Sequence, residues 1–160
     1  MLYLGFKTLH VLAVVLFLGN ITTGIFWKEH ADRTRDPRII AHAIAGIIAA
    51  DRLFTIPSVL LIVLAGVSTA MSASLPLLRT GWIFWSLVLF TLSGIAFMGW
   101  LVPIQRKMHQ LMRAAAESGS PDWDGYHRLS RAWGFWGAVA LLLPLAAMVL
   151  MVVKPPIPGL

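Results

Sequence analysis

Four long apolar segments alternate with polar connections along the chain. They cover about residues 4–27, 53–72, 82–103 and 132–153. Crossing the hydrocarbon core of a bilayer takes roughly 20 apolar residues in a helix, and each segment meets that length. We therefore predict an all-α fold, an integral membrane four-helix up-and-down bundle that forms a single domain over residues 1–160.

The second and third spanning helices are predicted to continue well beyond the membrane. Asp36 and Pro37 have the pattern of an N-cap followed by proline at the first helical position, and helical spacing then runs through IIAHAIAGIIAADR into the second span. After Pro103, IQRKMHQLMRAAAES keeps helical character until Gly119, a helix-stop residue. Pro57 lies inside the second helix and favours a kink there.

Basic residues predict the orientation. Ten of the thirteen Lys and Arg residues fall in the first and third connections. The positive-inside rule then puts both termini in the periplasm and the helix extensions in the cytoplasm of a bacterial inner-membrane, multi-pass protein. The basic residues flank the apolar spans, and this location explains the net charge of +6 better than nucleic-acid binding does. The absence of cysteine excludes disulfides, iron–sulfur ligation and thiol chemistry.

The first connection, residues 28–38, is dense in charges of both signs and is predicted to be solvated. Asp51 and Arg52 mark the inner boundary of the second span, and Arg131 marks that of the fourth. An ion pair between helices is the default expectation at that level.

His10 is the first candidate for chemistry. It lies about six residues inside the first span, roughly 9 Å at 1.5 Å per residue. An ionisable side chain at that depth is a functional candidate. Its helix face is otherwise apolar, which suits a flat apolar ligand held by one axial nitrogen, and haem is the obvious case. A structural histidine bonded to a neighbouring helix is the alternative.

A second axial ligand would have to come from another helix at similar depth. By residue count the other spans place Met71, Ser86 and Met148 there, and no second histidine. A methionine in a span more often serves packing than ligation. The sequence therefore does not support a bis-histidine site at this level.

Asn20, Thr22 and Thr23 form a polar stretch deeper in the same helix. Such groups commonly bond across helices and serve packing, and the functional alternative is the polar wall of a cavity. The other histidines, His30, His42, His109 and His127, fall on the predicted cytoplasmic side without a metal-binding spacing. No phosphate loop, Ser-His-Asp arrangement or pair of intramembrane carboxylates is present.

Several stretches resemble an uncharacterised bacterial group of predicted integral membrane proteins, domain-of-unknown-function family 2269. They include KTLHVLAVVLFLGNITTGIFW, ADRLFTIPSVLLIVLAG, GWIFWSLVLFTLSG, LVPIQRKM and YHRLSRAWGFWG. The resemblance extends over nearly the whole chain and brings no assigned activity.

More distantly, the layout is similar to HemJ-type protoporphyrinogen oxidases and to copper-resistance D type membrane domains. The shared positions are Lys7, His10, Pro57, Gly66 and Trp82. In the HemJ type the first-span histidine is implicated in binding b-type haem together with a lysine of the third span. This chain has Ser86 at that lysine position, so the resemblance implies haem binding through His10 rather than the oxidase activity.

Two hypotheses of different kinds follow. In the first, the chain binds haem b through His10, for redox or small-molecule sensing, and the predicted cofactor-binding residues are Lys7, His10, Arg79, Ser86 and Met148. Lys7 and Arg79 would meet the propionates near the outer surface. In the second, it is a non-enzymatic transport or assembly component, without cofactor, which docks a protein partner on its cytoplasmic helix extensions. Copper handling is disfavoured by the scarcity of Met and His pairs on the outer side.

Overall fold

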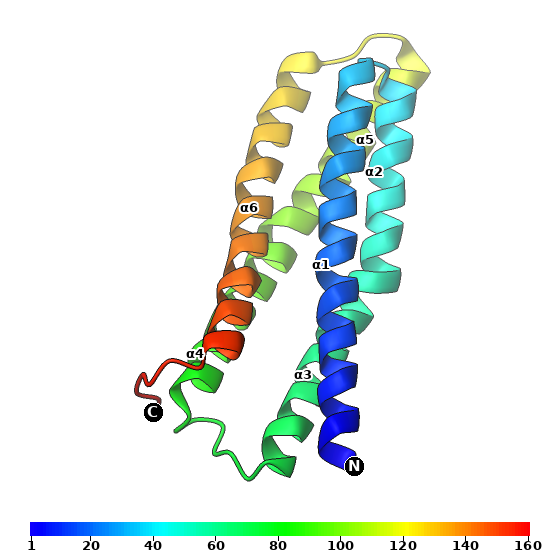
Figure 1. Ribbon diagram of the computed structural model, residues 1–160. Helices are drawn as coiled ribbons and strands as arrows, with labels where there is room; N and C mark the ends of the chain where they lie inside the picture. The colour runs from blue at the N-terminus through cyan, green and yellow to red at the C-terminus, as the bar shows by residue number, and fades with distance from the viewer.

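The computed structural model describes residues 1–160, and all of its regular elements are helical. Figure 1 shows the helices side by side, with both chain termini at the same end of the molecule. Four continuous helices are long and apolar enough to cross a membrane, which confirms the four predicted spans: Leu2–Thr34, Pro37–Ser72, Gly81–Ser118 and Trp123–Val153. The first is α1 and the last is α6.

Each middle helix contains one π-helical turn. The second helix is α2 (Pro37–Ala50), η1 (Asp51–Thr55) and α3 (Ile56–Ser72). The third is α4 (Gly81–Ala96), η2 (Phe97–Leu101) and α5 (Val102–Ser118).

Proline explains where the two π-helical turns lie. Pro57 and Pro103 each follow a π-helical turn at the second position of the next helix. A proline ring clashes with the carbonyl four residues back in a regular α-helix. In the wider turn the amide of Ile56 bonds the carbonyl of Asp51, five residues back, which relieves that crowding. The structure thus places a π-helical turn where the sequence predicts a kink.

The predicted helix ends are confirmed. The Asp36 side chain accepts a hydrogen bond from the amide of Arg38 at 2.8 Å, with Pro37 at the first helical position. Asp122 caps α6 in the same way by accepting from the amide of Gly125 at 2.8 Å. Gly119 ends α5 in the left-handed conformation, with φ of 71°.

Most of the buried apolar side chains lie at the end of the molecule away from the termini. This part, which we call the connection half, consists of α2, η2, α5, the C-terminal part of α1 and the N-terminal part of α6. Its core contains ten buried residues: Ala31, Ile40, Ala41, Ile44, Leu101, Met108, Met112, Ala115, Tyr126 and Trp133. The connection half therefore contains the larger of the two apolar clusters.

The rest of the molecule, the terminal half, consists of α3, α4 and the remaining parts of α1 and α6. Its largest cluster of buried apolar side chains contains Ala13, Phe17 and Ile62, with Phe90 of α4 against Phe17 at a ring-centroid distance of 5.8 Å. Smaller buried residues such as Ala65 and Ala147 lie outside that cluster. Many large apolar side chains here, such as Leu64, are exposed. In a bilayer these side chains are solvated by lipid, so little protein core is needed.

Candidate functional site

His10 of α1 hydrogen-bonds to α3. Its Nδ1 lies 2.8 Å from the backbone oxygen of Ile62. A carbonyl only accepts, so Nδ1 carries the proton and Nε2 keeps a free lone pair. The ring also lies against Gly66, where an added Cβ would come within 2.9 Å of Nδ1. In this structure His10 therefore serves the packing of α1 on α3, the structural alternative that the sequence left open.

The other predicted cofactor residues have separate surroundings. Lys7 and Arg79 lie exposed on the surface, and the Met148 side chain is 38% exposed. Ser86 is buried between α4 and α6, where its hydroxyl donates to the carbonyl of Ala147 at 3.2 Å. No hydrogen bond or ion pair joins any of them to His10, and haem ligation stays a prediction.

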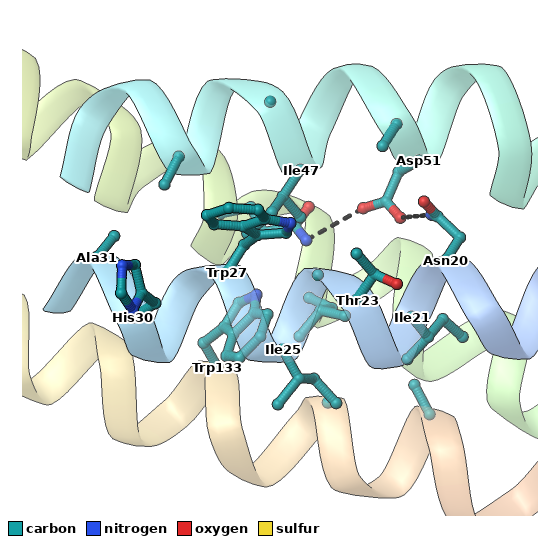
Figure 2. A pocket seen from close by; sticks show the side chains of 18 of the residues that line it. Asn20, Ile21, Thr23, Ile25, Trp27, His30, Ala31, Ile47, Asp51 and Trp133 are labelled. Carbon is teal, nitrogen blue, oxygen red and sulfur yellow. Dashed lines mark hydrogen bonds between the residues drawn. The ribbon is translucent and has the colours of Figure 1, made fainter. Parts of the chain in front are cut away.

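A polar network lies farther along α1, where the two halves of the molecule meet. At its centre is Asp51, 8% exposed, in η1. Its Oδ1 accepts from Thr55 at 2.9 Å and from Asn20 of α1 at 3.3 Å, and its Oδ2 accepts from Gln105 of α5 at 3.2 Å. Asn20 also donates to Thr55 at 2.9 Å. Figure 2 shows the hydrogen bond between Asp51 and Asn20 of α1.

All the partners of Asp51 are neutral. The three ion pairs of the structure each lie within one helix, so the expectation of an ion pair between helices at the level of Asp51, Arg52 and Arg131 is wrong. Arg52 is exposed and does not pair with its neighbour. A buried carboxylate without a cation is costly even when hydrogen-bonded. The chain therefore keeps a polar group at this position that packing alone does not require.

Asp51 also lines a cavity of about 400 Å³. The walls come from α1, α2, η2, α5 and α6, and are mostly apolar. Asp51 and Asn20 lie toward one end of the cavity, whereas His30 of α1 lies toward the other, as Figure 2 shows. Trp27 and Trp133 add aromatic surface between them. The cavity thus combines apolar walls with one acidic group.

The polar stretch of α1 serves both of the uses considered for it. Asn20 bonds across to η1 and lines the cavity, and Thr23 lines the cavity too. The hydroxyls of Thr22 and Thr23 donate within α1, to the carbonyls of Leu18 and Gly19 at 2.8 Å. Only Asn20 therefore connects this stretch to another helix.

A second polar cluster, the Lys28 clamp, joins α1 to α6 in the connection half. Lys28 is 6% exposed, although the sequence predicts a solvated segment there. Its Nζ lies 2.5 Å from Asp32 Oδ2, donates to the hydroxyl of Ser130, and lies 5.3 Å from the centre of the Trp133 ring. The hydroxyl of Tyr126 donates to the other oxygen of Asp32. The prediction of a wet segment is wrong for Lys28 because α6 covers it.

The sequence indicates Asp51 only as a residue at the boundary of the second span, and not as the centre of a buried polar network. An Asp-Arg pair at the end of a span is usually interfacial, and nothing local to it indicates that Asn20 and Gln105 converge there. No group of three or more His, Asp or Glu side chains in the structure could hold a metal ion. His42 lines the cavity with His30, whereas His127 lies beside Trp123 and Tyr126.

Comparison with known proteins identifies the family. A family model described as "Predicted integral membrane protein (DUF2269)" matches residues 4–155. No curated protein and no solved structure matches the chain. The more distant resemblance to HemJ-type and copper-resistance D type proteins is not found in these comparisons.

Proposed function

The chain belongs to the DUF2269 family of predicted integral membrane proteins, and we propose that it binds a small organic amine in the cavity beside Asp51. The observation that carries the proposal is the Asp51 carboxylate, buried in a cavity wall with three neutral donors and no cation. The protein would act as a non-enzymatic transport component without a cofactor.

The proposed orientation follows from charge and helix length. Ten of thirteen basic residues lie in the first and third connections, which favours periplasmic termini and places the connection half on the cytoplasmic side of a bacterial inner membrane. The second helix has 36 residues and the third 38. At 1.5 Å per residue each is about 54 Å or longer, against a hydrocarbon core of about 30 Å. The surplus supports cytoplasmic extensions, on which a protein partner remains a prediction.

A protonated amine matches the chemistry of Asp51. Ammonium groups donate hydrogen bonds and carry a positive charge, which would compensate the negative charge of the carboxylate. A carboxylate has about four lone-pair sites, and Asn20, Thr55 and Gln105 use three of them. An ionisable side chain inside a membrane protein that faces a cavity typically marks a ligand or ion pathway. Asp51 is thus the anchor for the charged end of the ligand.

The remaining walls match an apolar or aromatic body. Ligand pockets of about 300–1,000 Å³ with mostly apolar walls and a few polar groups are typical of small-molecule sites, and this cavity of about 400 Å³ is at the small end. Trp27 and Trp133 offer ring faces for stacking. A ligand with one ring and one amine would fit these dimensions.

The experiment measures binding by isothermal titration calorimetry on the full chain in detergent. The probe is 2-phenylethylamine, and its uncharged analogue is 2-phenylethanol. We expect the amine to bind and the alcohol to bind at least tenfold more weakly. Asp51→Asn, which keeps the shape of the side chain, should lower the affinity for the amine at least tenfold, which is about 1.4 kcal/mol.

Glu117→Gln is the matched control, because it removes one carboxylate from an exposed side chain of α5 far along the chain from the cavity residues. It should bind the amine like the unchanged protein. Equal binding of the amine by Asp51→Asn and the unchanged protein would overturn the proposal, as would a lack of binding by the unchanged protein. Size-exclusion chromatography checks that each variant is folded.

Haem at His10 is the other candidate from the sequence, and it concerns a different part of α1. The cavity does not include His10. The free lone pair on Nε2 is compatible with an axial ligand, since ligating histidines usually donate their other ring N–H to a carbonyl or carboxylate. An absorption spectrum after expression with ample haem tests it. A Soret band that His10→Ala abolishes would support haem binding, and a colourless protein would end it.

A further inference from the structure

A second, smaller cavity lies between the second helix and α5 and is lined by basic side chains. Its volume is about 260 Å³, and it is lined by Ala45, Ile48, Arg52, Arg106, His109 and Gln110. We propose that it binds the phosphate of an anionic phospholipid headgroup. This inference depends on the membrane placement of the chain and is independent of amine binding at Asp51.

The buried network positions this cavity. Gln105 donates to Asp51 at 3.2 Å and ties α5 to η1. Arg106 follows Gln105 in α5, and Arg52 follows Asp51 in η1. Each arginine is therefore rotated by about 100° around the helix axis from its buried neighbour. Both arginines are exposed, and both line the same cavity. The hydrogen bond from Gln105 to Asp51 therefore joins the two helices next to the point where both arginines line one groove.

Helical spacing builds the rest of the cavity. Ala45, Ile48 and Arg52 are separated by three and four residues and so lie on one face of the second helix. His109 and Gln110 lie three and four residues after Arg106 on α5. The floor is thus small and apolar at Ala45 and Ile48, and the donors stand at the rim. A phosphate needs donors, and an acyl chain or glycerol backbone tolerates the apolar floor.

The charges in this cavity are uncompensated. Arg52, Arg106 and His109 appear in none of the ion pairs or side-chain hydrogen bonds of the structure. The nearest acid along the chain, Asp51, is occupied by Asn20, Thr55 and Gln105 on its own side. Guanidinium groups bind phosphate oxygens through two parallel hydrogen bonds, which gives geometric selectivity as well as charge. The groove is therefore set up for an anion from outside the chain.

The depth of the cavity selects a lipid as the source of that anion. Arg52 directly precedes the apolar segment 53–72, and Arg106 follows the segment 82–103. The two arginines therefore lie where the spans meet the headgroup layer, which is about 5–8 Å thick on each side. Basic pockets between spanning helices at this level are suited to anionic headgroups.

The experiment measures lipid binding to the full chain in detergent micelles by native mass spectrometry, with phosphatidylglycerol as the anionic probe and phosphatidylcholine as the zwitterionic one. We expect phosphatidylglycerol to bind at least tenfold more tightly than phosphatidylcholine. The double variant Arg52→Gln/Arg106→Gln should lose at least tenfold in affinity for phosphatidylglycerol. Arg52→Lys/Arg106→Lys keeps the charge without the paired donors and should lose an intermediate amount.

Arg33→Gln/Arg113→Gln is the matched control, since it removes the same charge from two exposed arginines outside the cavity. It should bind phosphatidylglycerol within twofold of the unchanged protein. An equal loss in both double variants would show a mere net-charge effect and overturn the site, and so would unchanged binding by the Arg52 and Arg106 variant. Inorganic phosphate is titrated separately, and binding of it as tight as that of the lipid would overturn the lipid assignment. Circular dichroism checks folding of every variant.

Discussion

The two halves of the molecule are held together by different means. In the connection half, ten buried side chains pack into one core, and the Lys28 clamp joins α1 to α6. In the terminal half, the largest apolar cluster has three buried side chains, and side chains bond directly to backbone carbonyls of neighbouring helices. His10 reaches the carbonyl of Ile62, and Ser93 reaches that of Ala140 at 2.6 Å.

A change from lipid to water along the bundle is expected to produce such a difference. Where water surrounds helices, burial of apolar area drives their association. Lipid tails are as apolar as the side chains they touch, so within a bilayer that driving force disappears and close contacts and interhelical hydrogen bonds remain. The contrast between the halves thus supports a boundary between lipid and water near Asp51, and the following changes test it by their effects on the free energy of unfolding in mixed detergent micelles.

The largest effect is expected at the Lys28 clamp. Lys28→Met leaves the Asp32 carboxylate without its cation in a largely buried site, and we expect a loss of about 3 kcal/mol. Lys28→Met/Asp32→Leu, which removes both charges, should recover part of that loss. Arg33→Met, in an exposed pair, should change the free energy by less than about 1 kcal/mol. Equal effects at Lys28 and Arg33 would show that the clamp is not buried in the folded protein.

A matched pair of core truncations compares the halves directly. Met112 is fully buried in the connection half, and Met112→Ala should cost about 3 kcal/mol through lost transfer energy and a cavity. Ile62→Ala in the terminal half should cost about 1 kcal/mol. In a bilayer the Ile62 side chain is buried from lipid and not from water, so its burial contributes little to the free energy of unfolding. Equal costs would contradict the assignment of different surroundings to the two halves.

A steric test addresses the contact of α1 with α3. Gly66→Ala would bring a Cβ within 2.9 Å of His10 Nδ1, and we expect a cost of about 2 kcal/mol. His10→Ala/Gly66→Ala should cost less than the two single changes added together, because the clash disappears with the ring. Gly94→Ala is the control, since nothing lies within 4 Å of its added Cβ. Additive effects at the two positions would mean that His10 lies away from Gly66.

The smallest effect is expected for one interhelical hydrogen bond. Ser93→Ala removes the bond from α4 to the carbonyl of Ala140 and should cost about 0.6 kcal/mol. Thr22→Val removes a bond within α1, to the carbonyl of Leu18, and should leave the free energy unchanged within error. A loss at Thr22 as large as that at Ser93 would show that the bond between helices adds nothing special.

Local patterns were sufficient to predict the elements of the fold. Apolar runs of spanning length predict four helices, and Asp36, Pro37 and Gly119 mark ends that the structure confirms. Each of these signals depends on neighbours in sequence. The π-helical turns are a partial exception, because Pro57 predicts a disturbance without specifying its kind.

The candidate site could not be predicted in the same way. Asp51 is a buried acid only because Asn20 and Gln105 of two other helices lie against it. These partners are 31 and 54 residues away from Asp51 in the chain. The same holds for Lys28, which opens a segment (residues 28–38) with eight other charged or polar residues and is covered by Ser130 and Trp133 from α6. Burial of a charge depends on distant partners, and one sequence by itself carries no record of them.

The wide turns η1 and η2 shift the angular position, around the helix axis, at which the residues beyond them would be expected in the two middle helices. A π-helical turn accommodates one residue more than an α-helical turn, and one residue corresponds to about 100° of rotation around the axis. A helical wheel drawn for α3 therefore points in the wrong direction when it is continued into α2. Any face assigned along these helices has to be counted afresh from Ile56 and from Val102, and deleting a single residue from either turn would restore α-helical spacing while both ends of that helix keep their faces.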